Sequence, residues 1–78
     1  NMKDFEKLKN IGFVQIYESE TKELNGYSIY NLKTEFINIT VIDNPILGWS
    51  LMKNDLPPVL IDLDELIEEV VILMKNTK

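Results

Sequence analysis

Cysteine, histidine, arginine and alanine are all absent from this 78-residue sequence. Without cysteine there is no disulfide framework and no thiolate to act as a nucleophile or a zinc ligand. Without histidine, the commonest general base and metal ligand is missing as well. Most catalytic constellations are thereby excluded, so we predict a protein that is not an enzyme and uses no metal or other cofactor.

Long apolar runs and positive charge are also scarce. No apolar stretch approaches the roughly 18 residues of a membrane-spanning helix, and no basic segment followed by an apolar stretch opens the chain. Eight Lys stand against thirteen Asp and Glu, which gives a formal net charge of −5. Because a negative field repels phosphate backbones and anionic lipids, we expect no nucleic-acid partner, no membrane partner and a cytoplasmic location.

The residues that are present fit a small globular domain. A hydrophobic content of 45% with 27% charged residues predicts a single domain over residues 1–78 with a modest core.

Asn1, which precedes Met2, is interpreted as a residue left by cloning. Ten Ile and eight Asn, with no Arg or Ala, indicate AT-rich codons. We therefore expect the source to be a low-GC bacterium, or a phage or mobile element that lives in one.

Residues 2–11 predict a short amphipathic helix. Met2, Phe5 and Leu8 recur at three-residue spacing among charged residues. Gly12 suits the left-handed backbone position just beyond a helix end. We therefore predict that Gly12 is the structural cap of this helix.

Alternating apolar and polar residues predict four strands, at 13–18, 27–32, 36–42 and 47–53. Asn25 and Gly26 favour a hairpin turn between the first two strands, and residues 54–58 favour a rigid turn after the fourth. With a second helix following, this order predicts an α+β fold: a small two-layer domain of helix, four-stranded antiparallel meander and helix. Both helices are expected on one face of the sheet.

The alternation also assigns the two faces of the sheet. We expect the helices to cover the face that carries Val14, Ile16, Ile29, Ile37, Ile39 and Val41. The other face then presents some of Tyr17, Tyr30, Leu32, Phe36, Ile42 and Met52 among small polar residues. Aromatic residues among small polar groups are typical of a recognition surface, but a curled sheet with ordinary cross-strand pairs also accounts for them and is the favoured interpretation. Trp49 is expected in the core, or else in a binding patch with Pro57 and Pro58.

The last quarter of the chain predicts a capped amphipathic helix. Asp62 at the N-cap and Glu65 three residues later form the pattern of a capping box, and Ile61 with Leu66 forms that of a hydrophobic staple. At 100° per residue, the apolar residues fall in a sector of about 160° that can lie flat on a sheet. These residues are Leu63, Leu66, Ile67, Val70, Val71, Leu73 and Met74.

One apolar residue, Ile72, projects from the opposite face of this helix, among Glu65, Glu68 and Glu69. It is either a scattered surface residue or a contact with a partner. Six acids and no base lie between Lys53 and Lys75, so this side of the molecule is expected to be negative. A protein partner with a basic surface fits that charge.

A catalytic interpretation of the same segment rests on residues 59–64, an apolar run that ends in Asp-x-Asp. This run resembles the first motif of the haloacid-dehalogenase-like phosphatases. The resemblance implies a parallel α/β fold, with Asp62 as the nucleophile, Asp64 as the general acid and carboxylates that hold magnesium. It covers six residues, and Glu65 and Leu66 stand where the family has Gly-Thr.

Together these observations favour a non-enzymatic protein-interaction or inhibitor-type module. The candidate interaction surface comprises Glu65, Glu68, Glu69, Ile72, Tyr17, Tyr30 and Trp49. The alternative is a self-associating structural subunit, a homodimer formed through the open sheet face or Ile72. A phosphatase-like enzyme that uses Asp62 and Asp64 is a more distant alternative.

Overall fold

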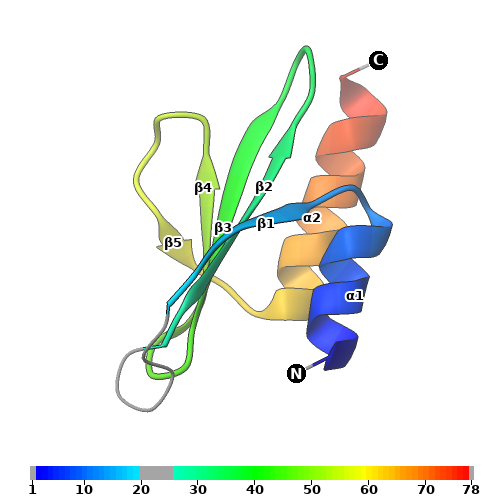
Figure 1. Cartoon of the computed structure of the whole chain (residues 1–78). Helices are drawn as coiled ribbons and strands as arrows, with labels where there is room; N and C mark the ends of the chain where they lie inside the picture. Colours follow the sequence, from blue (N-terminus) through cyan, green and yellow to red (C-terminus); the bar gives the residue numbers. More distant parts are fainter. Residues whose placement is uncertain (1, 20–25, 78) are drawn as a thin grey trace.

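The chain folds into two layers, with both helices on one face of an antiparallel sheet (Figure 1). The computed structural model describes residues 2–19 and 26–77. Its elements are α1 (Met2–Asn10), β1 (Val14–Glu18), β2 (Ser28–Lys33), β3 (Asn38–Asn44), β4 (Gly48–Lys53), β5 (Val59–Leu60) and α2 (Leu63–Asn76). The strands lie in chain order, β1-β2-β3-β4-β5. The predicted α+β fold with an antiparallel meander is therefore confirmed, with five strands instead of four.

The additional strand, β5, forms where the sequence predicted only a turn and a helix start. Val59 pairs with Leu51 of β4, Leu60 pairs with Ser50, and the Ile61 amide donates a hydrogen bond to the Trp49 carbonyl at 3.1 Å. A strand of two residues is too short to show an alternating pattern, so periodicity alone does not reveal it.

The end of α1 has the geometry that the sequence predicts. Gly12 has a φ of +110°. The Phe13 amide donates to the Leu8 carbonyl at 3.1 Å and the Gly12 amide donates to the Lys9 carbonyl at 3.0 Å, which together form a Schellman motif. A Cβ on Gly12 would lie 2.9 Å from Cδ1 of Leu32, so the absence of a side chain lets the turn approach the sheet.

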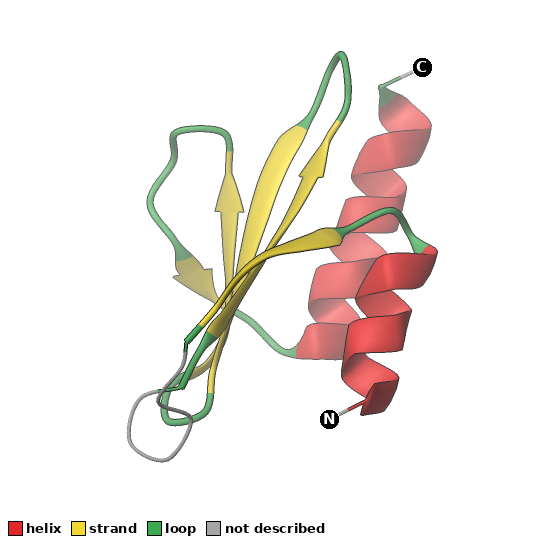
Figure 2. Cartoon of the chain, in the orientation of Figure 1, coloured by secondary structure: helices red, strands yellow, loops and turns green. Residues whose placement is uncertain are grey.

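The core lies between the two helices and the central strands. It comprises Leu8, Phe13, Tyr30, Leu32, Ile37, Ile39, Val41, Leu51, Leu66 and Val70. Strand register aligns several of these residues in rows, because Tyr30 lies opposite Val41, and Val41 lies opposite Leu51. Figure 2 shows both helices against this side of the sheet, which we call the covered face. The opposite side is the open face.

The sequence-based assignment of faces is wrong for β1 and β2. Ile29 lies opposite Ile42 on the open face, while its neighbour Tyr30 is buried on the covered face. In β1, Val14 and Ile16 are exposed, and an irregularity in the ladder near Ile16 shifts the register. Because side chains alternate with a period of two, a shift of one residue exchanges the faces.

The N-terminus of α2 departs from the prediction in its hydrogen bonds. Asp62 occupies the N-cap position, with φ −70° and ψ 148°, but its side chain forms no capping hydrogen bond. The capping box with Glu65 is therefore not formed. Both carboxylates are exposed, where water can solvate them and the amides of the first turn. The helix is held instead by packing, because Leu66 and Val70 are almost wholly buried.

Two predictions concern residues outside the described ranges. Asn25 of the predicted hairpin turn between β1 and β2 lies there, as does Asn1. The neighbouring pairing of β1 with β2 is described and is antiparallel, from Val14 opposite Asn31 to Glu18 opposite Ser28.

Candidate functional site

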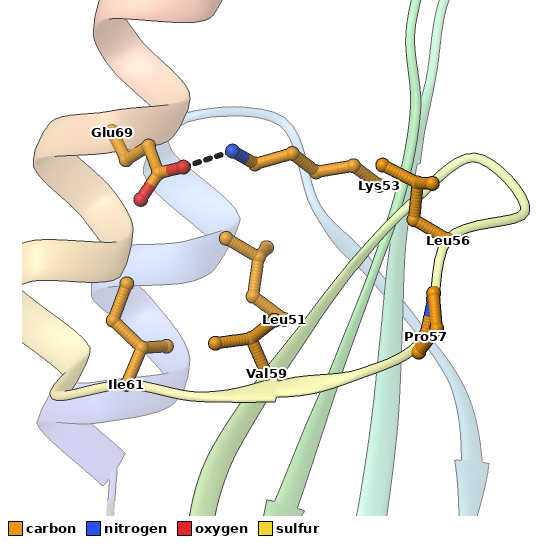
Figure 3. Close-up of a pocket in the computed structure, with 7 residues that line it drawn as sticks. All are labelled: Leu51, Lys53, Leu56, Pro57, Val59, Ile61 and Glu69. Carbon is orange, nitrogen blue, oxygen red and sulfur yellow. Dashed lines mark hydrogen bonds and ion pairs between the residues drawn. The ribbon is translucent and has the colours of Figure 1, made fainter.

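A groove opens between α2 and the β4–β5 hairpin, at one edge of the covered face (Figure 3). Its volume is about 260 Å³. The groove is lined by Leu51, Lys53, Leu56, Pro57, Val59, Ile61 and Glu69. We call it the α2–β5 groove. Five of these seven residues are apolar, and the other two form an ion pair.

The groove exists because β5 extends the sheet beyond the reach of the helices. Val59 pairs with Leu51 and therefore shares the covered face. Yet Leu51 is buried, whereas Val59 and Leu56 are each 62% exposed. Figure 3 shows Leu51, Val59 and Ile61 together at the side of the groove nearest α2, with Leu56 and Pro57 on the hairpin. Contiguous exposed apolar side chains of this kind mark binding sites more often than isolated ones do.

An ion pair between Lys53 of β4 and Glu69 of α2 borders the groove (Figure 3). Both side chains are about two-fifths exposed, so water screens the attraction and its contribution to stability is small. Beyond Lys53 the chain contains no base before Lys75, and six acids lie between the two. The ion pair can therefore break with little loss of stability when a cation from another molecule approaches Glu69.

The flank of α2 beside the groove carries acidic residues and Ile72. At 100° per residue, Glu65, Glu69 and Ile72 fall within about 60° of one another on the helix. The contact of Glu69 with Lys53 shows that Glu69 faces the hairpin. Ile72 is 51% exposed and Glu65 is exposed, while Glu68 lies farther round the helix. Ile72 is therefore an exposed apolar residue on the solvent side of α2, outside the residues that line the groove.

The aromatic candidates lie outside the α2–β5 groove, and Trp49 lines another hollow together with Glu65. Tyr30 is 5% exposed, and its ring lies 5.7 Å from that of Phe5 and 6.3 Å from that of Trp49. Its predicted place on an interaction surface is therefore wrong, because the register with β3 turns it into the core. Trp49 packs against the core, as the favoured interpretation predicts. Tyr17 lies on β1, with its ring 5.2 Å from that of Tyr27.

The aspartates of the phosphatase-like motif do not converge. Asp62 is exposed, and Asp64 is exposed and lies 3.4 Å from the Lys7 ammonium of α1. Within residues 2–19 and 26–77, no three acidic side chains gather closely enough to hold a metal ion. The apolar run before Asp62 is an antiparallel edge strand, unlike the parallel strand that the resemblance implies.

In the described part of the chain, burial perturbs the titration of Asp43 on β3 and Tyr30 on β2, both on the covered face. Partial burial raises the pKa of the Asp43 carboxyl, and the nearby Asp4 carboxylate raises it further. Burial likewise raises the pKa of the Tyr30 hydroxyl, which a hydrogen bond with Ser28 partly offsets. Both groups line a second hollow, beside Phe5 and Tyr27.

Sequence reasoning found the acidic flank of α2 but missed the groove. Its lining residues come from positions 51 to 69 and meet only after β4, β5 and α2 have packed. The apolar residues Leu56 and Val59 on either side of Pro57 and Pro58 were the available signal, since a turn is usually flanked by more polar residues.

Neither helix in the described part of the chain combines the length and apolarity needed to cross a bilayer. Comparisons of the chain with protein-family profiles, with curated proteins and with solved structures gave no match.

Proposed function

We propose that this chain is a protein-interaction module that binds a basic, amphipathic segment of a partner through the α2–β5 groove and the adjoining flank of α2. One observation carries this proposal. The exposed apolar side chains of Leu56 and Val59 share the groove with the Glu69 carboxylate, and the exposed residues Glu65 and Ile72 lie on the same helix.

The size of the groove favours a protein side chain as its occupant. Small-molecule sites usually enclose about 300–1,000 Å³. The groove, at about 260 Å³, is smaller and is lined mainly by aliphatic side chains. Such a surface suits one or two aliphatic side chains of a partner, which release water as they enter it.

The negative charge of the flank determines which charged residues the partner can carry next to those aliphatic side chains. Lys or Arg on the partner would meet Glu65 and Glu69, whereas acidic residues would be repelled. A cation near Glu69 also replaces Lys53, so the carboxylate keeps a charged partner. An inhibitor-type role fits this pattern, with the acidic module covering a basic surface of its target.

A peptide of matching chemistry tests the proposal. The probe is a helical peptide of Leu and Lys, with Leu at positions i, i+3, i+4 and i+7, followed by fluorescence anisotropy. We expect saturable binding that weakens as salt rises, because screening acts on exposed charges. Replacing Leu by Ser, or Lys by Glu, should abolish binding. Equal binding of the Leu-to-Ser peptide would contradict an apolar groove.

Matched variants of the protein locate the site. Glu65→Lys reverses a charge on the flank, and Glu6→Lys makes the same change on an exposed position of α1. We expect Glu65→Lys to weaken binding on the order of 3- to 10-fold more than Glu6→Lys does. Leu56→Ser should weaken binding by a similar factor with little effect on the fold, because Leu56 is largely exposed. Equal losses in the two Lys variants would indicate a general charge effect and reject the site.

A further inference from the structure

The open face of the sheet carries a row of side chains that crosses all five strands. Cross-strand pairing places Tyr17, Ile29, Ile42, Ser50 and Leu60 side by side in that order. Four of the five are apolar, and Leu60 is 63% exposed. Both described helices lie on the other side of the sheet (Figure 1). The row is therefore an apolar strip that no described helix covers.

This face differs from the rest of the molecule in charge. Among the described strand residues that register places on it, Lys33 is the one charged side chain, and none is acidic. The whole chain has thirteen acids and a net charge of −5. Two copies of so acidic a protein repel each other on most approaches. When two copies approach each other through their open faces, the carboxylates of the described strands are not brought together.

Three polar residues of the open face, Asn31, Asn38 and Thr40, form hydrogen bonds with one another. The Asn31 side-chain amide lies 2.9 Å from Asn38 Oδ1, 3.1 Å from the Ile39 carbonyl and 3.2 Å from Thr40 Oγ1. Polar groups that keep hydrogen bonds lose less when water is removed. Amides also carry both a donor and an acceptor, so an identical surface related by a two-fold axis can complement them.

The edges of the sheet are less suited to self-association. β5 contains two residues and follows Pro57 and Pro58, and β1 has an irregular register between Gln15 and Tyr17. Short edge strands, prolines and bulges all discourage the addition of another strand. Face-to-face packing is then the remaining way for sheets to meet.

We infer that the open face is the interface of a homodimer, in which two copies pack their Tyr17-to-Leu60 rows against each other about a two-fold axis. The inference is independent of the proposed function, because the α2–β5 groove opens on the covered face. A dimer would then present two acidic grooves on its outer sides, which strengthens binding to repeated basic segments.

Sedimentation equilibrium from about 1 μM to about 1 mM, a range that resolves weak and moderate affinities, tests this inference. We expect the unaltered chain to be a dimer at the upper end. Leu60→Lys and Ser50→Lys should each raise the dimer dissociation constant at least about tenfold, since a two-fold axis brings the new charges together. Asn10→Lys, an exposed change on α1, is the control and should leave the constant unchanged.

A monomer at about 1 mM would overturn the inference. So would a dimer that neither Leu60→Lys nor Ser50→Lys weakens while circular dichroism shows both variants folded. If Glu65→Lys weakened the dimer instead, the interface would be on the flank of α2 and the inference would also be wrong. Peptide binding by the Leu60→Lys variant separates the two proposals, because the groove should be intact in it.

Discussion

The two faces of the sheet are built from the same strands but differ in what they bury. On the covered face, Val41 and Leu51 are packed beneath the helices. On the open face, the adjacent Ile42 and Met52 are only partly buried, and Thr40 lies between Asn31 and Met52. Apolar content alone therefore does not identify the core, because the helices determine which of two moderately apolar faces loses contact with water.

The largest effect should come from truncating neighbouring residues on opposite faces. Leu51→Ala removes a buried side chain and should lower the free energy of unfolding by about 2–5 kcal/mol through lost burial and cavity formation. Met52→Ala acts on a partly exposed residue and should cost less than about 1 kcal/mol. Urea denaturation at low micromolar concentration measures both. Equal losses of unfolding free energy in the two variants would contradict the difference in burial between the two faces.

Gly12→Ala tests how closely the α1 turn packs on the covered face. A methyl group there is strained by the positive φ and would contact Leu32 Cδ1 at 2.9 Å. We expect a loss of about 1–3 kcal/mol in unfolding free energy. Gly48→Ala is the matched control, because Gly48 has a φ of +96° with no heavy atom within 4 Å. Equal effects in thermal denaturation would assign the whole cost to backbone strain.

The partly buried Asp43 on the covered face predicts a pH dependence. Burial raises the pKa of this carboxyl in the folded state, so the unfolded state binds fewer protons than the folded state between the two pKa values. Its contribution to stability therefore falls as pH rises from the unfolded pKa of about 3.9 through the raised folded pKa. Asp43→Asn should be more stable than the unaltered chain at neutral pH, and the difference should shrink on acidification.

Denaturation curves across this pH range check the sign of the effect. Asp55→Asn, in the exposed β4–β5 turn, controls for the loss of one negative charge. A neutral-pH gain as large in Asp55→Asn as in Asp43→Asn would mean that net charge, and not burial at the covered face, is responsible.

The smallest effect is expected at the start of α2. Since the Asp62 side chain forms no capping bond, Asp62→Ala should cost less than about 0.5 kcal/mol, below the 0.5–2 kcal/mol usual for a lost cap. Thermal denaturation beside Leu66→Ala compares the cap with the packing that holds the helix on the covered face. A loss above about 1 kcal/mol for Asp62→Ala would show that the side chain does cap the helix in solution.

Local signals in the sequence predicted the features that depend on neighbouring residues. The end of α1 at Gly12 follows from a backbone preference that acts over a few positions. The order of helices and strands indicated the α+β class, because short connections favour an antiparallel meander. The N-cap position of Asp62 was also predicted correctly, but the predicted capping hydrogen bond is not formed, since an exposed side chain is free to turn toward water.

Features that depend on contacts between residues far apart in the sequence could be established only from the structure. In β2, both alternating sets contain apolar residues, Ile29 on one side and Tyr30 with Leu32 on the other. Only the pairing of Tyr30 with Val41 decides between them. The α2–β5 groove forms only when Leu51 of the sheet and Glu69 of the helix layer come together, and no local sequence pattern predicts that contact.

Composition and short-range geometry were enough to establish the secondary-structure order, the negative charge of the α2 segment and the absence of thiol and imidazole chemistry. Packing was needed to establish which sheet face is buried, where β5 pairs and which residues line the groove. Those outcomes depend on strand register and helix placement, where the many contacts of a whole layer outweigh any single local preference.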